Sequence, residues 1–123
     1  MELVFSTKKV DRICNDLKEA KKYFGGNADL SRSLMARINA LREAENLKDI
    51  VVQPPFHFHK LYDVGMNKLD GCFAIDVKSR REPWRIILRP LDNNKEPFTD
   101  FNIDAMAETV EIVEIREVSK HYE

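Results

Sequence analysis

The sequence has few of the features that would crosslink a small protein or place it in a membrane. Its two cysteines, Cys14 and Cys72, lack CxxC spacing and neighbouring histidine clusters, so we expect reduced, packed thiols and no metal site. No apolar run approaches the roughly 20 residues that cross a bilayer, and the first residues lack the basic region of a signal peptide. These absences predict a cytoplasmic protein with no membrane contact and no cofactor.

Neither sign of charge dominates the chain, but the charges are unevenly distributed along it. The formal net charge is −1, whereas general nucleic-acid-binding proteins usually carry a large basic excess. Residues 56–90 hold seven Lys and Arg against four Asp and Glu, while residues 91–123 hold three against nine. We therefore expect one region that attracts phosphate, and an acidic region that faces either solvent or a basic partner.

The first half of the sequence predicts one strand followed by two helices. An apolar run at residues 3–5 indicates the strand. Apolar residues then recur at three- and four-residue steps over residues 10–24, which predicts an amphipathic helix that a pair of glycines ends. Asp29 can cap a second helix whose apolar stripe reaches Leu41, and the two helices should form a hairpin.

Three strand-like segments, 56–62, 71–77 and 84–89, follow a proline pair. Alternate side chains of a strand share a face, so the apolar residues of the last two segments should line one face of a sheet. The same alternation leaves Arg85 and Arg89 together on the other face. Two guanidinium groups on one face indicate a phosphate site.

The remainder of the chain predicts a polar excursion and a final strand. The sequence of residues 90–107 does not specify a structure, and residues 110–118 are β-branched enough to favour a strand. Their alternation slips at residues 112–113, which predicts a β-bulge there. We thus expect an α+β fold in a single domain over residues 1–123: a strand, a helical hairpin, then an antiparallel β-meander, with four to five strands in all.

This order of elements resembles the RelE/HigB superfamily of type II toxins, small ribonucleases that a cognate antitoxin holds inactive. Three stretches carry the resemblance: His59-Lys60-Leu61 leading to Leu69-Asp70-Gly71, the strand from Cys72 to Val77 with its partner from Trp84 to Ile87, and the terminal strand ending in His121-Tyr122. The resemblance implies a four- or five-stranded antiparallel sheet with the hairpin on one face and a concave RNA site on the other. It also implies metal-free cleavage of messenger RNA on the ribosome, and an antitoxin, typically a helix-turn-helix protein, as partner.

The chain departs from the family pattern in three places. Residues 62–68 intervene where the family has a short Lys-Gly turn. The chain ends with Lys120, His121 and Tyr122, where histidine-type members have aspartate, tyrosine and histidine in that order. The acidic C-terminal third also differs from the mostly basic toxins.

Metal-free RNA cleavage needs a base for the 2′-hydroxyl, cations for the charged transition state and an acid for the leaving 5′-oxygen. Imidazole exchanges a proton close to neutral pH, which makes His59 and His121 the candidates for base and acid. Arg85 and Lys60 are candidates for holding the phosphate oxygens, and Tyr122 for stacking a base or assisting proton transfer. Which histidine plays which role stays open.

Further basic residues are expected to contact RNA: Lys68, Lys78, Arg80, Arg81 and Arg89. Each candidate also has a structural interpretation. Lys60 has the opposite strand parity from His59, so a regular strand cannot present both to one site. Arg85 can instead pair with Asp76 across the hairpin, and His57 with His59 lacks a third metal ligand.

Two functions therefore remain. The first is a toxin endoribonuclease that inhibits translation. The alternative is a catalytically silent RelE-fold binding module that pairs with an antitoxin and modulates the transcriptional autoregulation of the pair, which the departures at the chain end and the acidic C-terminal third motivate.

Overall fold

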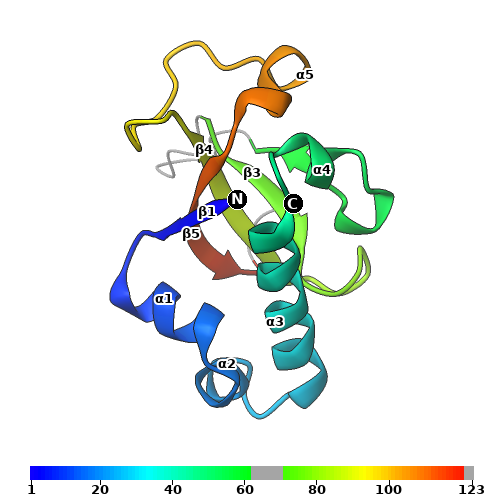
Figure 1. Cartoon of the computed structure of the whole chain (residues 1–123). Coiled ribbons are helices and arrows are strands. Elements are labelled where there is room, and N and C mark those ends of the chain that lie inside the picture. The colour runs from blue at the N-terminus through cyan, green and yellow to red at the C-terminus, as the bar shows by residue number, and fades with distance from the viewer. Residues whose placement is uncertain (62–70, 121–123) are drawn as a thin grey trace.

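A computed structural model describes residues 1–61 and 71–120, in which a five-stranded sheet carries helices on one face (Figure 1). The strands are β1 (Glu2–Phe5), β2 (His59–Lys60), β3 (Phe73–Asp76), β4 (Arg85–Leu91) and β5 (Ile112–Ser119). The helices are α1 (Lys8–Asn15), α2 (Leu17–Tyr23), α3 (Ala28–Glu43), α4 (Lys48–Val51) and α5 (Ile103–Met106), with short 3₁₀ turns η1 (Pro54–Phe56) and η2 (Ala107–Thr109). None of the helices within these ranges is long and apolar enough to cross a membrane.

The strand order is β1-β5-β4-β3-β2, which confirms the predicted α+β fold with an antiparallel meander. Strands β2 to β5 pair with their neighbours in antiparallel fashion. The sheet is nevertheless mixed, because β1 pairs with β5 in parallel, whereas the family resemblance implies antiparallel strands throughout. The long connection between β1 and β5, which includes all the helices, allows this parallel pairing.

The helical hairpin differs from the prediction in one break and one cap, and the short helices α4 and α5 were not predicted. The predicted helix over residues 10–24 is two helices, because Asp16 adopts an extended backbone and its carboxylate accepts bonds from the first backbone N–H groups of α2. Asn27, and not Asp29, caps α3 by accepting a hydrogen bond from the backbone N–H of Leu30. Asp29 lies in the first turn of α3, where a carboxylate is also favourable.

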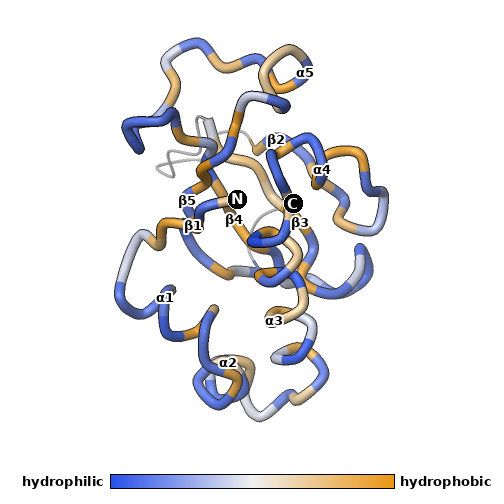
Figure 2. The backbone as a smooth tube through the Cα atoms, in the orientation of Figure 1, coloured by the Kyte–Doolittle hydropathy of each residue, from blue (hydrophilic) through white to orange (hydrophobic). Residues whose placement is uncertain are grey.

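The hydrophobic core fills the space between the helices and one face of the sheet. Its sheet side confirms the predicted alternation, because Phe73, Ile75 and Val77 share this core with Ile86 and Leu88. Figure 2 shows the central strands as largely hydrophobic and the connection between β3 and β4 as hydrophilic. A smaller cluster lies on the other face of the sheet, formed by Leu61, Cys72, Ala74 and Ile87.

The first predicted strand segment, 56–62, is mostly not a strand. Only His59 and Lys60 pair with β3 as β2, while Phe56 ends η1 and Tyr62 lies outside the described residues. His57 has φ 50°, in the left-handed region that non-glycine residues rarely adopt. The proline pair starts the 3₁₀ turn, and this left-handed residue then redirects the chain into β2.

The β-bulge predicted at residues 112–113 is also misplaced. The register between β4 and β5 shifts at Arg116. Ile87 pairs with Glu117, and the next residue of β4, Leu88, pairs with Ile115, so Arg116 is skipped. Ile115 and Val118, three residues apart, therefore both face the helical side and both belong to the core. A regular strand would have turned one of them away from the helices.

Candidate functional site

The sheet register assigns the predicted residues to two faces. His59 pairs with Ala74 and Lys60 pairs with Phe73, so the two side chains project to opposite sides of β2. This confirms the parity argument that one regular strand cannot present both side chains to one site. Ala74 lies on the same face of the sheet as His59 and pairs with Ile87 of β4. On that face of β4, Ile87 separates Arg85 from Arg89.

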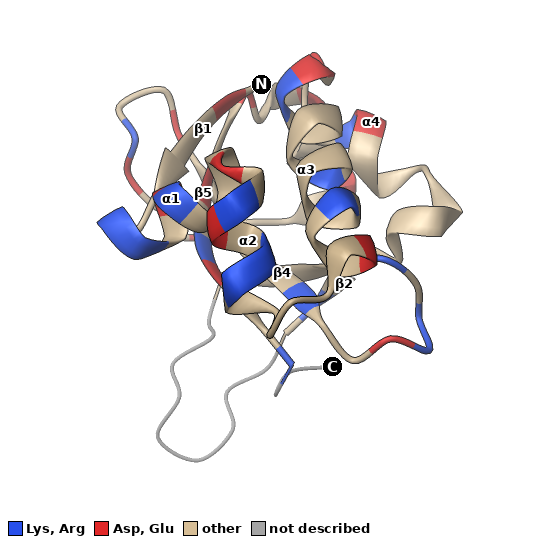
Figure 3. Ribbon diagram, turned by 90° about the horizontal axis from the view of Figure 1, so that it is seen from below, with Lys and Arg blue, Asp and Glu red and all other residues tan. Residues whose placement is uncertain are grey.

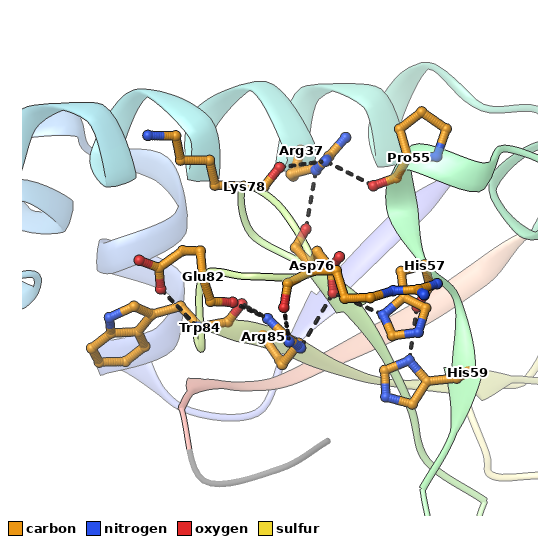
Figure 4. Close-up of polar contacts among 10 residues, drawn as sticks. Arg37, Pro55, His57, His59, Asp76, Lys78, Glu82, Trp84 and Arg85 are labelled. Atoms are coloured by element: carbon orange, nitrogen blue, oxygen red, sulfur yellow. Dashed lines mark hydrogen bonds and ion pairs between the residues drawn. The ribbon is translucent and has the colours of Figure 1, made fainter.

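Asp76 is the centre of a polar cluster at the end of β3 (Figure 4). Its carboxylate is 2% exposed, and Oδ1 lies 3.2 Å from Nδ1 of His57 and 3.2 Å from Nε of Arg85. The rings of His57 and His59 have centroids 4.4 Å apart and are tilted by 31° to each other. Two imidazoles, one carboxylate and one guanidinium are thus gathered at one edge of the sheet.

The hydrogen bonds of the two imidazoles fix where their hydrogens lie. Nδ1 of His59 lies 2.8 Å from the carbonyl oxygen of His57, and a carbonyl oxygen can only accept, so this nitrogen carries the hydrogen. The same reasoning places a hydrogen on Nδ1 of His57, which faces the Asp76 carboxylate. In the neutral form of each ring, Nε2 is therefore the basic nitrogen.

Nε2 of His59 is buried, and no described residue offers it a hydrogen-bond partner. An unsatisfied polar atom in such a position costs about 1 to 3 kcal/mol, and in native proteins it calls for an explanation. His57 is more accessible, with 30% of its side chain exposed. The pair therefore combines an enclosed Nε2 on His59 with a partly exposed side chain on His57.

Arg85 is held by protein groups on every side of its guanidinium. Nη1 donates to the carbonyl oxygens of Glu82 and Trp84, and Nη2 donates to that of Arg80. Nε forms the ion pair with Asp76, without a hydrogen bond, and the side chain is 8% exposed. The structural interpretation of Arg85, pairing with Asp76 across the hairpin, is the one that the contacts confirm.

Arg37 of α3 braces the same cluster from the helical side. Its Nε donates to the backbone carbonyl oxygen of Asp76, and Nη2 donates to those of Pro55 and Lys78. Its guanidinium also lies over the Phe56 ring, 4.6 Å from the centroid. Burial lowers the pKa of Arg37, and the nearby Asp76 opposes that effect. Arg37 therefore connects α3, η1 and the end of β3.

The remaining predicted residues lie apart from this cluster or outside the described ranges. Lys78, Arg80 and Arg81 are exposed in the β3–β4 connection. Lys60 and Arg89 line a pocket at the other end of β3. Three predicted residues lie outside the described ranges: Lys68, His121 and Tyr122.

A basic surface on the first two helices was not anticipated from the sequence. Figure 3 shows Lys and Arg gathered on α1 and α2. Six of these residues are exposed: Lys8, Lys9, Arg12, Lys18, Lys21 and Lys22. The signal was present, because residues 8–22 hold six Lys and Arg against three Asp and Glu.

His57 and Asp76 are the functional candidates that sequence reasoning undervalued. The signal for Asp76 was a carboxylate inside an otherwise apolar strand, since a buried acid is normally paired. No comparable signal existed for His57, because its contacts depend on a left-handed turn that the predicted strand did not contain. Among residues 1–61 and 71–120, no group of three or more His, Cys, Asp or Glu is arranged to hold a metal ion.

Comparisons with protein-family models, with curated proteins and with solved structures found no match to this chain. Support for a function therefore comes from the order of its elements and from the contacts of the imidazole cluster.

Proposed function

We propose that this chain is a toxin of the RelE/HigB kind, which cleaves messenger RNA on the ribosome without a metal. The observation that carries the proposal is the oriented imidazole pair, His57 and His59, with Asp76 behind it. The order of strand, helical hairpin and antiparallel meander is the second support. The proposed setting is the cytoplasm, where a cognate helix-turn-helix antitoxin holds the toxin inactive.

The proposed reaction uses the two Nε2 atoms in opposite protonation states, and it requires that RNA binding expose Nε2 of His59, which is buried in the free protein. One imidazole removes the proton of the 2′-hydroxyl, and the 2′-oxygen attacks the adjacent phosphorus. The bond from phosphorus to the 5′-oxygen breaks, and the second imidazole, protonated beforehand, gives its proton to that oxygen. The products are a 2′,3′-cyclic phosphate end and a 5′-hydroxyl end, so one proton enters and one leaves the pair in each cycle.

Positive charge near the pair comes from the β3–β4 connection, where Lys78, Arg80 and Arg81 are exposed beside Arg85. The basic surface of α1 and α2 belongs to the helical side of the sheet and is a separate area attractive to ribosomal RNA. In this proposal Arg85 is a positioning residue. It holds Asp76, and Asp76 in turn orients His57.

The test is inhibition of translation by the purified protein. Added to translating bacterial ribosomes, the wild type should stop incorporation of labelled amino acids. His59→Asn keeps an N–H near the Nδ1 position but has no atom at the Nε2 position, so inhibition should weaken by about 100-fold or more. Lys95→Ala, remote from the cluster in a turn after β4, is the control and should inhibit as the wild type does. Unaffected translation at saturating wild-type protein would remove the proposal.

The second candidate function is the catalytically silent binding module. The contacts of Arg85 favour it, because a guanidinium already bound to three carbonyl oxygens and a carboxylate is poorly placed to receive a phosphate. This function predicts tight binding to a helix-turn-helix protein encoded in the adjacent reading frame, altered operator binding by that protein, and uncut messenger RNA on ribosomes.

A further inference from the structure

A pocket of about 570 Å³ lies beside Gly71 and Phe73 at the start of β3, whereas the imidazole cluster lies at the other end of that strand. Most of its apolar lining comes from the segment after β4. The residues of that segment that contribute apolar surface are Pro97, Phe98, Phe101 and Ile103. The volume is large enough to enclose a large side chain of a binding partner.

Residues 97–103, which form the outer wall of this pocket, are held at both ends. Before them, the Asp92 carboxylate accepts hydrogen bonds from two backbone N–H groups of a tight turn, and Leu91 then pairs with Pro97. Towards the other end, the side-chain oxygen of Asn102 caps α5. A wall that is already held in place loses little conformational entropy when a partner binds.

The rings of this wall form a connected set. Phe98 and Phe101 have centroids 5.1 Å apart, and Phe101 lies 5.8 Å from Phe73 in an edge-to-face arrangement. Phe98 and Phe101 are partly buried, so part of each ring remains accessible to a partner. Aromatic pockets of this kind receive the apolar anchor residues that contribute most to protein–protein binding.

The same wall carries exposed carboxylates that no cation of the described residues pairs with. These are Glu96, Asp100 and Asp104, each adjacent in sequence to a residue that lines the pocket. Residues 91–108 contain five acids and one base, Lys95, and that base forms an ion pair with Glu2 at 2.8 Å. The wall is therefore aromatic on the pocket side and acidic around it.

Two cations also line the pocket, Lys60 and Arg89, and both belong to the strands on its inner side. The sheet register directs their side chains to opposite faces of the sheet. The Arg89 guanidinium contacts Sγ of Cys72 at 3.6 Å, and both cations have further interactions within the protein. They do not form a joint anion site, and the charge that a partner meets along the outer wall is negative.

We propose that this pocket is a docking site for a protein partner, which packs one large apolar side chain against Phe98 and Phe101 and places basic residues along the acidic wall. The rings select the apolar anchor, and the unpaired carboxylates select its basic flanks. A nucleic acid does not suit this wall, because its phosphates would meet like charges. The docking site is independent of the proposed ribonuclease activity, since it shares no residue with the imidazole cluster.

The test is an NMR titration of the full chain with a short synthetic peptide of lysine and serine that carries one central phenylalanine. The amide signals of residues 97–103 should shift with saturation, at a Kd of about 1 mM or lower. Peptides in which alanine replaces the phenylalanine, or glutamate replaces the lysines, should bind about tenfold more weakly or worse.

A pair of charge variants tests the acidic wall. Asp100→Asn combined with Asp104→Asn should weaken binding of the basic peptide about threefold or more, and the difference should shrink at high salt. Glu19→Gln combined with Asp29→Asn is the matched control. It removes the same charge from exposed positions on α2 and α3, at the other end of the molecule from α5 (Figure 1), and should bind as the wild type does.

Three results would overturn the docking site: no saturable shift with the basic peptide, equal binding of either altered peptide, or equal weakening by the two charge variants. A single-stranded RNA oligonucleotide that shifts the same amide signals would overturn it as well. The translation assay separates this site from the proposed function. Peptide binding by a protein that leaves translation unaffected would keep the docking site and remove the ribonuclease, and inhibition of translation by a protein that does not bind the peptide would do the reverse.

Discussion

Asp76 shows how one residue connects the fold of this protein to its proposed chemistry. Its carboxylate is enclosed by β-sheet residues, and it faces both a guanidinium and an imidazole. A buried charge is stable only when it is paired, so Asp76 and Arg85 depend on each other. The same carboxylate sets the orientation of His57.

We expect Asp76→Asn to destabilise the protein by about 3 kcal/mol or more, because the Arg85 guanidinium would remain buried without its counter-ion. Urea unfolding measures the effect. Asp29→Asn is the matched control: that carboxylate is exposed and pairs with Arg32 on the surface, so its loss should cost less than about 1 kcal/mol. Equal midpoints for the wild type and Asp76→Asn would show that the pairing does not stabilise the fold.

Cys14 provides a prediction about alkaline pH. Burial, reinforced by Asp11 and opposed by Arg42, raises the pKa of its thiol from 9.0 to about 12. Because the folded protein holds this proton more tightly than the unfolded chain, the contribution to stability is complete below the unfolded pKa and is lost as the pH rises toward the folded pKa. Burial raises the pKa of Tyr23 as well, with the same sign.

The free energy of unfolding should therefore fall between about pH 8 and about pH 10.5, with roughly 2 kcal/mol of the fall due to Cys14. Urea titrations of the wild type and Cys14→Ala at both pH values measure that part. Removal of the thiol costs packing equally at both values, so only the difference between them is informative. The same decrease in both proteins would show that the thiol does not contribute to it.

Strand parity made several single-residue predictions possible. Parity placed Arg85 and Arg89 on the face away from the core and predicted Asp76 as a pairing partner of Arg85. It also predicted that His59 and Lys60 project to opposite faces. It could not predict the ring contact of His57 with His59, because parity applies only within a strand and His57 precedes β2 in a left-handed conformation.

At the scale of elements, Arg37 shows how a helix can organise a site to which it contributes no chemistry. Its three hydrogen bonds reach the backbone at residues 55, 76 and 78, so α3 holds both the turn before β2 and the end of β3. Each of these carbonyl groups would otherwise need another partner. The position of His57 relative to Asp76 depends on this brace.

We expect Arg37→Met to lower stability by about 2 to 3 kcal/mol, since methionine keeps an apolar stem over Phe56 but donates no hydrogen bond. Arg32→Met, on the exposed side of the same helix, should cost less than about 1 kcal/mol. Thermal unfolding of the two variants gives the comparison. If Arg37→Met proved no worse than Arg32→Met, the brace would not contribute to stability.

The elements that the sequence predicted well are those with a strong local pattern. The first strand, α3 and the core strands followed from apolar periodicity. The break at Asp16 did not, because the apolar spacing continues through it and only the local capping geometry ends α1. The bulge at Arg116 was missed because its position depends on pairing with β4, a long-range contact.

At the scale of the whole molecule, the sheet separates a structural face from a face with chemical groups. The main core and the helices occupy one side, while Asp76, Arg85 and His59 occupy the other. The order of elements predicted this architecture, including the antiparallel meander. The pocket beside residues 97–103 could not be predicted, because the polar segment that forms its wall has no periodic pattern.

The most direct test of the proposed mechanism is to map the ends of messenger RNA after the purified protein is added to translating ribosomes. The mechanism predicts new 5′-hydroxyl ends at ribosome-bound codons, paired with 2′,3′-cyclic phosphate ends, and their formation slowed about 100-fold or more in His59→Asn. Intact messenger RNA at saturating wild-type protein, or cleavage by His59→Asn at the wild-type rate, would contradict the assignment of the imidazole pair as the catalytic centre.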